Sequence, residues 1–291
     1  MSQRLEPLQI PGTTLLPQPE GKEKVTFSFG RNWRDFVTRS LSPARERQAI
    51  ESIVDFLELP DLQGPTFLDI GCGSGLFSLA AYRLGARSII SFDADPFSVA
   101  CCEHMRLKAG RPENWTVLQG SVLNREFLAS LQPADIVYAW GSLHHTGDMW
   151  SAIGNAARLV TPGGLFLVSI YNCVEGRGGS AFWVKAKRLY NRTSEPGKRL
   201  LEAAYVLRYT VLPDILRFKS PLKTIRSYGQ DRGMDFMVDV RDWLGGYPYE
   251  YATADAVFSF CKRELGFELR NLRTTNTLGT NQFLFRSLAR R

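Results

Sequence analysis

The chain has 291 residues, of which 44% are hydrophobic and 22% charged, and its formal net charge is +7. These values are ordinary for a globular protein, and the length allows one α/β domain with a lid or two small domains. No stretch reaches the roughly 18 consecutive apolar residues of a membrane-spanning helix, and residues 1–11 lack the apolar segment of a secretory signal. We therefore expect neither a transmembrane segment nor a secretory signal.

The five cysteines give a second indication of class. An odd number of cysteines without a repeated C-x-x-C spacing argues against a disulfide framework and against a structural zinc site. No other cluster of ligand residues suggests a metal ion. The sequence therefore predicts a protein of the reducing cytoplasm, and it names no metal-ligating residues and leaves metal dependence open.

The positive charge is concentrated in one segment. Residues 175–232 contain 13 of the 36 Lys/Arg residues but only 5 of the 29 Asp/Glu residues, so the rest of the chain is close to neutral. Such a segment can be an ordinary solvated face. It can also contact an acidic substrate, an anionic lipid surface or nucleic acid.

The N-terminal part is irregular up to a predicted helix. Residues 1–21 hold four prolines and few apolar positions, and an aromatic cluster follows at residues 27–36. Ser42 and Pro43 then give a helix start, because proline at the first helical position loses no hydrogen bond. Apolar residues recur at helical spacing from Ile50 to Leu57.

From Thr66 the pattern becomes strand, turn and helix, repeated. Short apolar strands are predicted at residues 67–70, 88–92, 115–118, 134–138 and 165–170, and helices at 77–84, 96–109 and 149–159. This alternation is typical of parallel βαβ units with right-handed crossovers.

Residues 175–250 interrupt the alternation and read as mostly helical. Within them, Leu200–Phe218 is apolar over more than one helical face, and we expect it to be buried against the core. The alternatives are a lipophilic pocket, a membrane surface or a second subunit. The chain then returns to a helix at 254–265 and a hairpin of strands at 267–275 and 282–288.

The strongest motif is the glycine-rich turn after the first strand. Gly71, Gly73 and Gly75 have the spacing G-x-G-x-G, whereas the dinucleotide fingerprint would need glycine at Leu76. Asp93 lies 20 residues after Gly73, at the end of the second strand, where a carboxylate can accept hydrogen bonds from ribose hydroxyls. An acid just before the glycines, at position 69, suits a cofactor with a positively charged group better than a pyrophosphate.

Five segments, at residues 67–75, 93–96, 119–121, 134–138 and 161–164, together resemble the class I S-adenosylmethionine (SAM)-dependent methyltransferases. The resemblance implies an α/β fold with a Rossmann-like seven-stranded, mostly parallel sheet whose last strand is antiparallel, with a helical lid inserted here. It also implies that the cofactor is SAM. The implied cofactor-binding residues are Asp69, Gly71, Cys72, Gly73, Gly75, Asp93, Ala94, Ser121, Val122 and Trp140.

Two histidines follow the fourth strand, where ligands sit in this fold. His144 and His145 are the candidate catalytic residues, as a base or as a group that orients the acceptor. The alternative is that a histidine in this loop only bonds a neighbouring carbonyl. The candidate substrate-binding residues are Phe29, Asn32, Trp33, Tyr171, Asn172, Tyr247 and Tyr249.

The expected organisation has four parts: an N-terminal arm and cap (1–50), the SAM-binding core (51–172), a basic helical lid (173–250) and a C-terminal helix and strand pair (251–291). We expect O-methylation of a small or medium-sized acceptor, which the basic lid suggests is anionic or lipid-linked. The alternatives are a tRNA, rRNA or protein methyltransferase, and a SAM-binding regulatory subunit without catalysis.

Overall fold

A computed structural model of the protein describes residues 42–232 and 236–288. The arm and the aromatic cluster before Ser42 lie outside these ranges. The candidate substrate residues Phe29, Asn32 and Trp33 therefore remain predictions.

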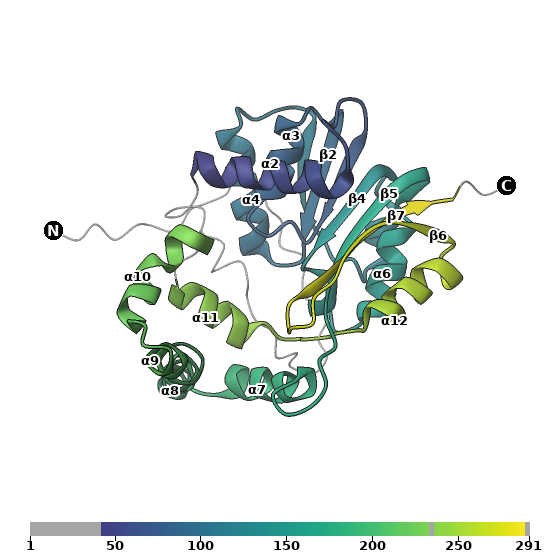
Figure 1. Cartoon of the computed structure of the whole chain (residues 1–291). Helices are drawn as coiled ribbons and strands as arrows, with labels where there is room; N and C mark the ends of the chain where they lie inside the picture. The colour runs from purple at the N-terminus through teal and green to yellow at the C-terminus, as the bar shows by residue number, and fades with distance from the viewer. Residues whose placement is uncertain (1–41, 233–235, 289–291) are drawn as a thin grey trace.

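A seven-stranded sheet forms the centre of the protein (Figure 1), with the strand order β3-β2-β1-β4-β5-β7-β6. Strand β7 is antiparallel to both of its neighbours, and the pairs from β3 to β5 are parallel. This confirms the predicted Rossmann-like sheet. The strands are β1 (Thr66–Ile70), β2 (Ser88–Asp93), β3 (Trp115–Gln119), β4 (Ala134–Trp140), β5 (Val160–Tyr171), β6 (Phe267–Arg273) and β7 (Thr280–Ser287).

Helices cover both faces of the sheet, because successive strand residues point to opposite sides. Phe67 belongs to the hydrophobic cluster shared with α2, α3 and α4, whereas Leu68 belongs to the cluster shared with α6 and α12. The helices of the core are α2 (Pro43–Leu57), α3 (Leu76–Arg83), α4 (Pro96–Lys108), α5 (Arg125–Ala129), η1 (Leu143–His145), α6 (Met149–Ala157), α12 (Ala254–Ser259) and η3 (Phe260–Glu264).

Side-chain caps set where several of these helices begin. The Ser42 hydroxyl accepts a hydrogen bond from the Arg45 N–H, and the Asp95 carboxylate accepts one from the Phe97 N–H. The sequence analysis did not predict α5. Its cap is Asn124, whose side chain accepts from two backbone N–H groups of the first turn.

The lid segment (residues 173–250) contributes five described helices and one π-helical turn, which lie beside the carboxyl ends of the strands (Figure 1). They surround a third hydrophobic cluster centred on Trp183, Tyr190 and Phe236. The chain leaves and re-enters the core at adjacent points, because Asn172 and Ala252 form a parallel bridge. The elements are α7 (Ser180–Arg192), α8 (Glu195–Val206), η2 (Leu207–Val211), α9 (Leu212–Leu216), α10 (Pro221–Arg232) and α11 (Phe236–Gly245).

The predicted burial of the Leu200–Phe218 helix is wrong. Leu200 is 71% exposed and Leu216 is 78% exposed. The helix packs on α7 and α11 through one side only, with Leu201, Tyr205 and Val206 against the third cluster. Its remaining apolar residues face away from that cluster because no other described element covers them.

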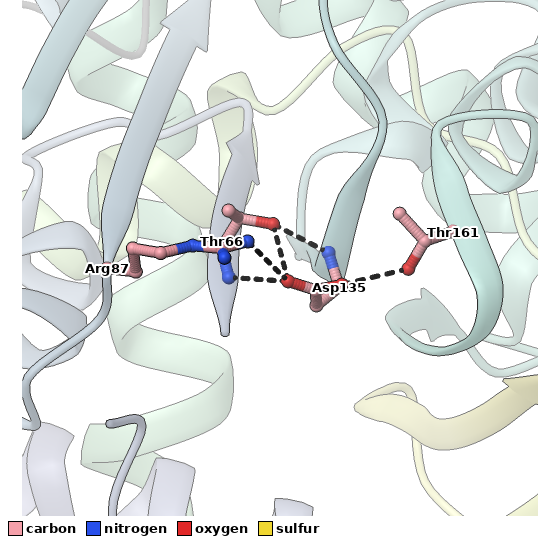
Figure 2. Close-up of polar contacts among 4 residues, drawn as sticks. All are labelled: Thr66, Arg87, Asp135 and Thr161. Atoms are coloured by element: carbon pink, nitrogen blue, oxygen red, sulfur yellow. Dashed lines mark hydrogen bonds and ion pairs between the residues drawn. The ribbon is translucent and has the colours of Figure 1, made fainter. Parts of the chain in front are cut away.

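Asp135 joins the amino-terminal ends of neighbouring strands in the sheet (Figure 2). Its carboxylate accepts hydrogen bonds from the Thr66 N–H at 2.9 Å and hydroxyl at 3.0 Å, and from the Thr161 hydroxyl at 3.1 Å. The Arg87 guanidinium lies 3.5 Å from the same carboxylate. One side chain thus connects β1, β4 and the start of β5. The hydrogen bonds and Arg87 hold the pKa of Asp135 below its ordinary value despite its partial burial.

Candidate active site

A cavity of about 900 Å³ lies at the carboxyl ends of the strands. It receives residues from the ends of β1, β2, β4 and β5 and from the lid segment at residues 242–248. The strand order changes direction between β1 and β4, and ligands of open α/β sheets bind at such a switch point. Its volume is in the range of known small-molecule sites.

The glycine turn begins at the end of β1 and is fixed by close contacts. The N–H groups of Gly71 and Cys72 both donate to the Phe92 carbonyl, at 2.8 and 3.1 Å. A Cβ atom on Gly71 would lie 2.3 Å from the Ser142 Cβ, and the Ser142 hydroxyl donates to the Ile70 carbonyl. Only glycine therefore lets the loop after β4 approach the end of β1 so closely.

Gly75 has a packing role that the resemblance did not imply. It does not line the cavity, and a Cβ atom there would lie 2.8 Å from the Cys102 Cα in α4. Its left-handed backbone (φ +80°) also starts α3. Gly75 thus permits close packing of the α3 start against α4, and its predicted contact with the cofactor stays a prediction.

Asp69 is a buried acid at the head of a hydrogen-bond chain. It accepts from the Ser78 hydroxyl at 2.5 Å, Ser78 and Ser91 are 2.7 Å apart, and the Trp115 indole N–H donates to Ser91 at 2.9 Å. Because the single Ser78 proton goes to the carboxylate, Ser91 must donate to Ser78, so every hydroxyl in the chain is directed toward Asp69. Burial raises the pKa of Asp69 to about 7, although the bond from Ser78 lowers it, and Asp93 raises it further.

Asp93 lies at the end of β2 and lines the cavity with Asp69. Its carboxylate accepts from the Gly73 N–H at 3.0 Å and from the Asp95 N–H at 2.9 Å. Burial raises the pKa of Asp93 to about 6, while these backbone bonds oppose the shift. The sequence-predicted residues Cys72, Ala94, Ser121, Val122 and Trp140 line the same cavity, together with the turn residues Gly71 and Gly73.

These residues fit a ligand that carries positive charge. Two carboxylates with raised pKa values, the buried Asp69 and the partly buried Asp93, are stabilised in the ionised form by a nearby cation. The SAM sulfonium and ammonium groups are such cations. The Tyr138 hydroxyl also lies buried at this cavity without a hydrogen-bond partner among the described residues.

The two histidines after β4 occupy different environments. His145 lines the cavity, and its Nδ1 lies 2.6 Å from the Pro248 carbonyl, to which it must donate. Burial lowers the pKa of His145 to about 3, so the imidazole is neutral and Nε2 carries the lone pair. His144 is buried outside the cavity lining, and its Nδ1 accepts from the Tyr171 N–H at 3.3 Å. His144 is placed to support the loop, so the geometry does not fit it for catalysis.

The candidate substrate residues also separate into two groups. Tyr171 and Tyr247 line the cavity. Asn172 does not; its amide donates to the carbonyls of Thr275 and Thr277 and so holds the β6–β7 hairpin. Tyr249 is also outside the lining and is buried in the third cluster. These two residues therefore support the site from outside.

The sequence of residues 242–251, rich in aromatic and hydrogen-bonding groups, suits a substrate wall, but only Tyr247 and Tyr249 of this segment were named as candidates and Asp242 was not. Asp242 lines the cavity, and its charge raises the pKa of Tyr171, which burial has already raised. Its position at the start of the aromatic segment 242–251 was the available signal. Among the described lining residues the acids are Asp69, Asp93, Asp95 and Asp242, and the single Lys/Arg is Arg45. The basic residues of the lid thus give no support for an anionic acceptor in this cavity.

Comparison with known proteins indicates the family of the chain. The sequence profile of a methyltransferase domain family matches residues 43–204. A ubiquinone biosynthesis O-methyltransferase from Paracidovorax citrulli is 35% identical over 116 residues, 39% of this chain and 47% of that protein. A ribosomal protein L11 methyltransferase from Aliivibrio salmonicida is 33% identical over 84 residues, 29% of this chain and 26% of that protein. The matched regions thus span less than half of these curated relatives.

Solved structures show the same fold at low sequence identity. An O-methyltransferase family protein from Burkholderia thailandensis has a TM-score of 0.51 at 14% identity, over 90% of this chain and 69% of that one. Magnesium protoporphyrin IX methyltransferase from Synechocystis, with bound S-adenosylhomocysteine (SAH), has a TM-score of 0.51 at 12% identity. The match covers 88% of this chain and 93% of that one.

The fold is that of the class I SAM-dependent methyltransferases, whose cofactor is SAM. Because the profile covers more than half of its length, this chain belongs to the methyltransferase domain family. Within the described residues, no helix has the length and apolar character needed to cross a membrane.

Proposed function

We propose that the protein transfers the methyl group of SAM to a hydroxyl oxygen of an uncharged, largely apolar acceptor of small or medium size. The observation that carries this proposal is the joint placement of His145, Tyr171 and Asp242 in the cavity that also contains Asp69 and Asp93. Local similarity to a ubiquinone biosynthesis O-methyltransferase supports oxygen as the methylated atom.

The cofactor half of the site would use the acids and the turn. Asp69 and the Gly71–Gly73 turn would hold the amino-acid end of SAM, Asp93 the ribose hydroxyls, and Ser121 and Val122 the adenine. When bound, SAM supplies an electrophilic methyl group on a positively charged sulfur. The carboxylate of Asp69 would offset that charge, because a buried acid interacts with a cation more strongly than an exposed one.

The acceptor half would position a hydroxyl and remove its proton. The neutral His145 would accept a hydrogen bond at Nε2 and so orient the hydroxyl oxygen. Burial makes His145 a weak proton acceptor, and the carboxylate of Asp242, which lines the same cavity, is our candidate for the base. Tyr171 and Tyr247 would form the apolar walls that exclude water.

The test combines binding and transfer. Calorimetric titration with SAM and SAH should give binding that Asp93→Ala abolishes. Labelled SAM with a panel of phenols and aliphatic alcohols should then give O-methylated products. Asp242→Asn should lower kcat by about 100-fold, in the range typical of a general base, with unchanged SAM affinity. Asp255→Asn in α12, an exposed acid outside the cavity lining, is the matched control.

His145→Gln retains a hydrogen-bond acceptor and should raise KM for the acceptor more than it lowers kcat. His104→Gln in α4, outside the cavity lining, is its control. Absence of SAM binding by the wild type, or full transfer by Asp242→Asn, would reject the proposal. Binding of SAM without transfer to any acceptor would instead support a regulatory role.

A second candidate is methylation of a protein amine. It is favoured by the local similarity to ribosomal protein L11 methyltransferases and by Asp242, since a carboxylate can also bind an ammonium group. Labelled SAM and a ribosomal protein extract distinguish the two: incorporation into protein in preference to the small alcohols would favour this candidate.

A further inference from the structure

Besides the surface that lines the cavity, the lid has a surface that faces away from it, which we call the outer face. It lies on α8, η2, α9, the connection at residues 217–220 and the first turn of α10, and none of these residues lines the cavity. Its apolar members include Phe218, which is 100% exposed, and Leu222, which is 66% exposed. The outer face consists of the exposed apolar residues Leu200, Leu207, Ile215, Leu216, Phe218 and Leu222 and the exposed basic residues Arg199, Arg208, Arg217, Lys219 and Lys223.

The orientation of α8 is fixed by polar contacts on its inner side. Glu202 is buried there, where it accepts hydrogen bonds from the Tyr190 hydroxyl at 2.7 Å and from the Arg241 guanidinium at 3.3 Å. These bonds hold Leu200 and Leu207 on the opposite, solvent-facing side. In Figure 1, α8, α9 and α10 lie farther from the sheet than α7 and α11 do.

The outer face is strongly cationic. Residues 195–226 include seven Lys/Arg and three Asp/Glu. Two of these acids, Glu202 and Asp214, are buried, and the exposed Glu195 is paired with Lys198 at 2.8 Å. The charge that faces solvent among the apolar side chains is therefore almost entirely positive.

We propose that the outer face binds the surface of an anionic phospholipid bilayer, with its apolar side chains at the acyl-chain boundary and its basic side chains beside the headgroups. Interleaved apolar and basic residues on one helical surface are the pattern of interfacial attachment. A second copy of the chain would place like charges opposite one another, and nucleic acid would leave the apolar residues in water. This inference goes beyond the proposed function and does not depend on methyl transfer.

Vesicle flotation of the full chain tests the proposal. Vesicles of phosphatidylcholine with 30% phosphatidylglycerol should bind the protein at least ten-fold more strongly than pure phosphatidylcholine vesicles, and 0.5 M salt should weaken the binding. Leu216→Ser/Phe218→Ser and Arg217→Glu/Lys219→Glu should each weaken it at least ten-fold. Matched controls are Leu107→Ser/Leu288→Ser and Lys262→Glu/Arg263→Glu, which change exposed residues outside the lid.

Retention of SAM binding by each variant separates loss of the surface from loss of folding. The proposal is overturned if the wild type does not bind anionic vesicles, or if both outer-face variants bind as the wild type does. A dimer in light scattering that the same variants dissociate, without vesicle binding, would assign the face to a second copy. A gel shift of bulk tRNA lost in the charge variant, again without vesicle binding, would assign it to nucleic acid.

Discussion

The Ser78 hydroxyl donates a hydrogen bond to the Asp69 carboxylate at 2.5 Å, at a point where both side chains are buried. The bond crosses from α3 to the end of β1, and Ser91 and Trp115 continue the chain behind it. The acid nearest to the glycine turn is therefore held by a directed set of donors. This relationship holds Asp69 in position and partly offsets the rise in its pKa that burial causes.

Ser78→Ala should weaken SAM binding by about ten-fold or more, because a hydrogen bond to a charged group contributes about 1.5–3 kcal/mol. The loss of the donor should also raise the pKa of Asp69 further. Calorimetric titration at pH 7.5 measures the change in Kd. Ser98→Ala, which alters another buried serine outside the cavity lining, should leave Kd unchanged. Equal effects from the two substitutions would contradict the role given to Ser78.

Asp69 should make the ligand-free protein less stable as the pH rises from about 4 to about 7. Its folded pKa of about 7 exceeds the ordinary value of 3.8, so in this range the folded state keeps a proton that the unfolded state has lost. The shift corresponds to about 4 kcal/mol. Asp69→Asn removes this loss, so its stability relative to the wild type should increase up to pH 7 and then level off. Urea unfolding at pH 5, 6, 7 and 8 measures the difference in the free energy of unfolding between the variant and the wild type. If this difference did not change with pH, the raised pKa of Asp69 would be rejected.

Asp135→Ala should lower the free energy of unfolding by about 2 kcal/mol, because it removes three hydrogen bonds at the amino-terminal edge of the sheet. SAM affinity should not change, since the cavity lies at the other end of the strands. The pKa of Asp135 is lowered in the folded state, so its contribution should be present above about pH 4 and lost below it. Urea unfolding at pH 7 and pH 3.5 tests this, with Arg87→Ala as a control that costs less than about 0.5 kcal/mol.

Lys187→Met should stabilise the protein at and below neutral pH by roughly 2 kcal/mol. Lys187 is fully buried, and its ammonium lies 4.1 Å from the Trp243 ring centroid and bonds the Trp243 carbonyl. Burial lowers its pKa to about 7, although Asp242 opposes the shift. Between about pH 7 and 10.5 the unfolded state binds more protons, so wild-type stability rises with pH and the advantage of the variant should shrink. Thermal unfolding of both proteins at pH 6 and pH 9.5 measures this. An equal difference in stability between the variant and the wild type at the two pH values would contradict the prediction.

The sheet could be predicted because its signals are local. Strands β1 to β5 each contain a short apolar run that begins or ends at a turn, and the glycine spacing after β1 is specific. The carboxyl-end placement of Asp69 and Asp93 then follows from the fold. Their roles toward SAM stay predictions.

The features that the sequence could not predict depend on contacts between residues far apart in the chain. His144 and His145 are neighbours with the same chemistry, and contacts distant in sequence distinguish them: His144 accepts from the Tyr171 N–H, whereas His145 donates to the Pro248 carbonyl, 103 residues away, and lines the cavity. The apolar pattern of Leu200–Phe218 indicated burial, but α7 and α11 cover only one side of that helix. Asp135 belongs to a motif shared with the methyltransferases and yet stabilises the opposite edge of the sheet (Figure 2).

The bridge between Asn172 and Ala252 makes the lid exchangeable. The Cys173 N–H donates to the Ala252 carbonyl and the Ala252 N–H to the Tyr171 carbonyl, so the two ends of the insertion leave the sheet side by side. A different segment could be joined at these two points without moving a strand. The exchange would have to keep residues 247–251, because Pro248 and Glu250 bond the histidine loop. Exchange of this one segment would then change the proposed acceptor specificity and the proposed membrane attachment together, while the cofactor site stays the same.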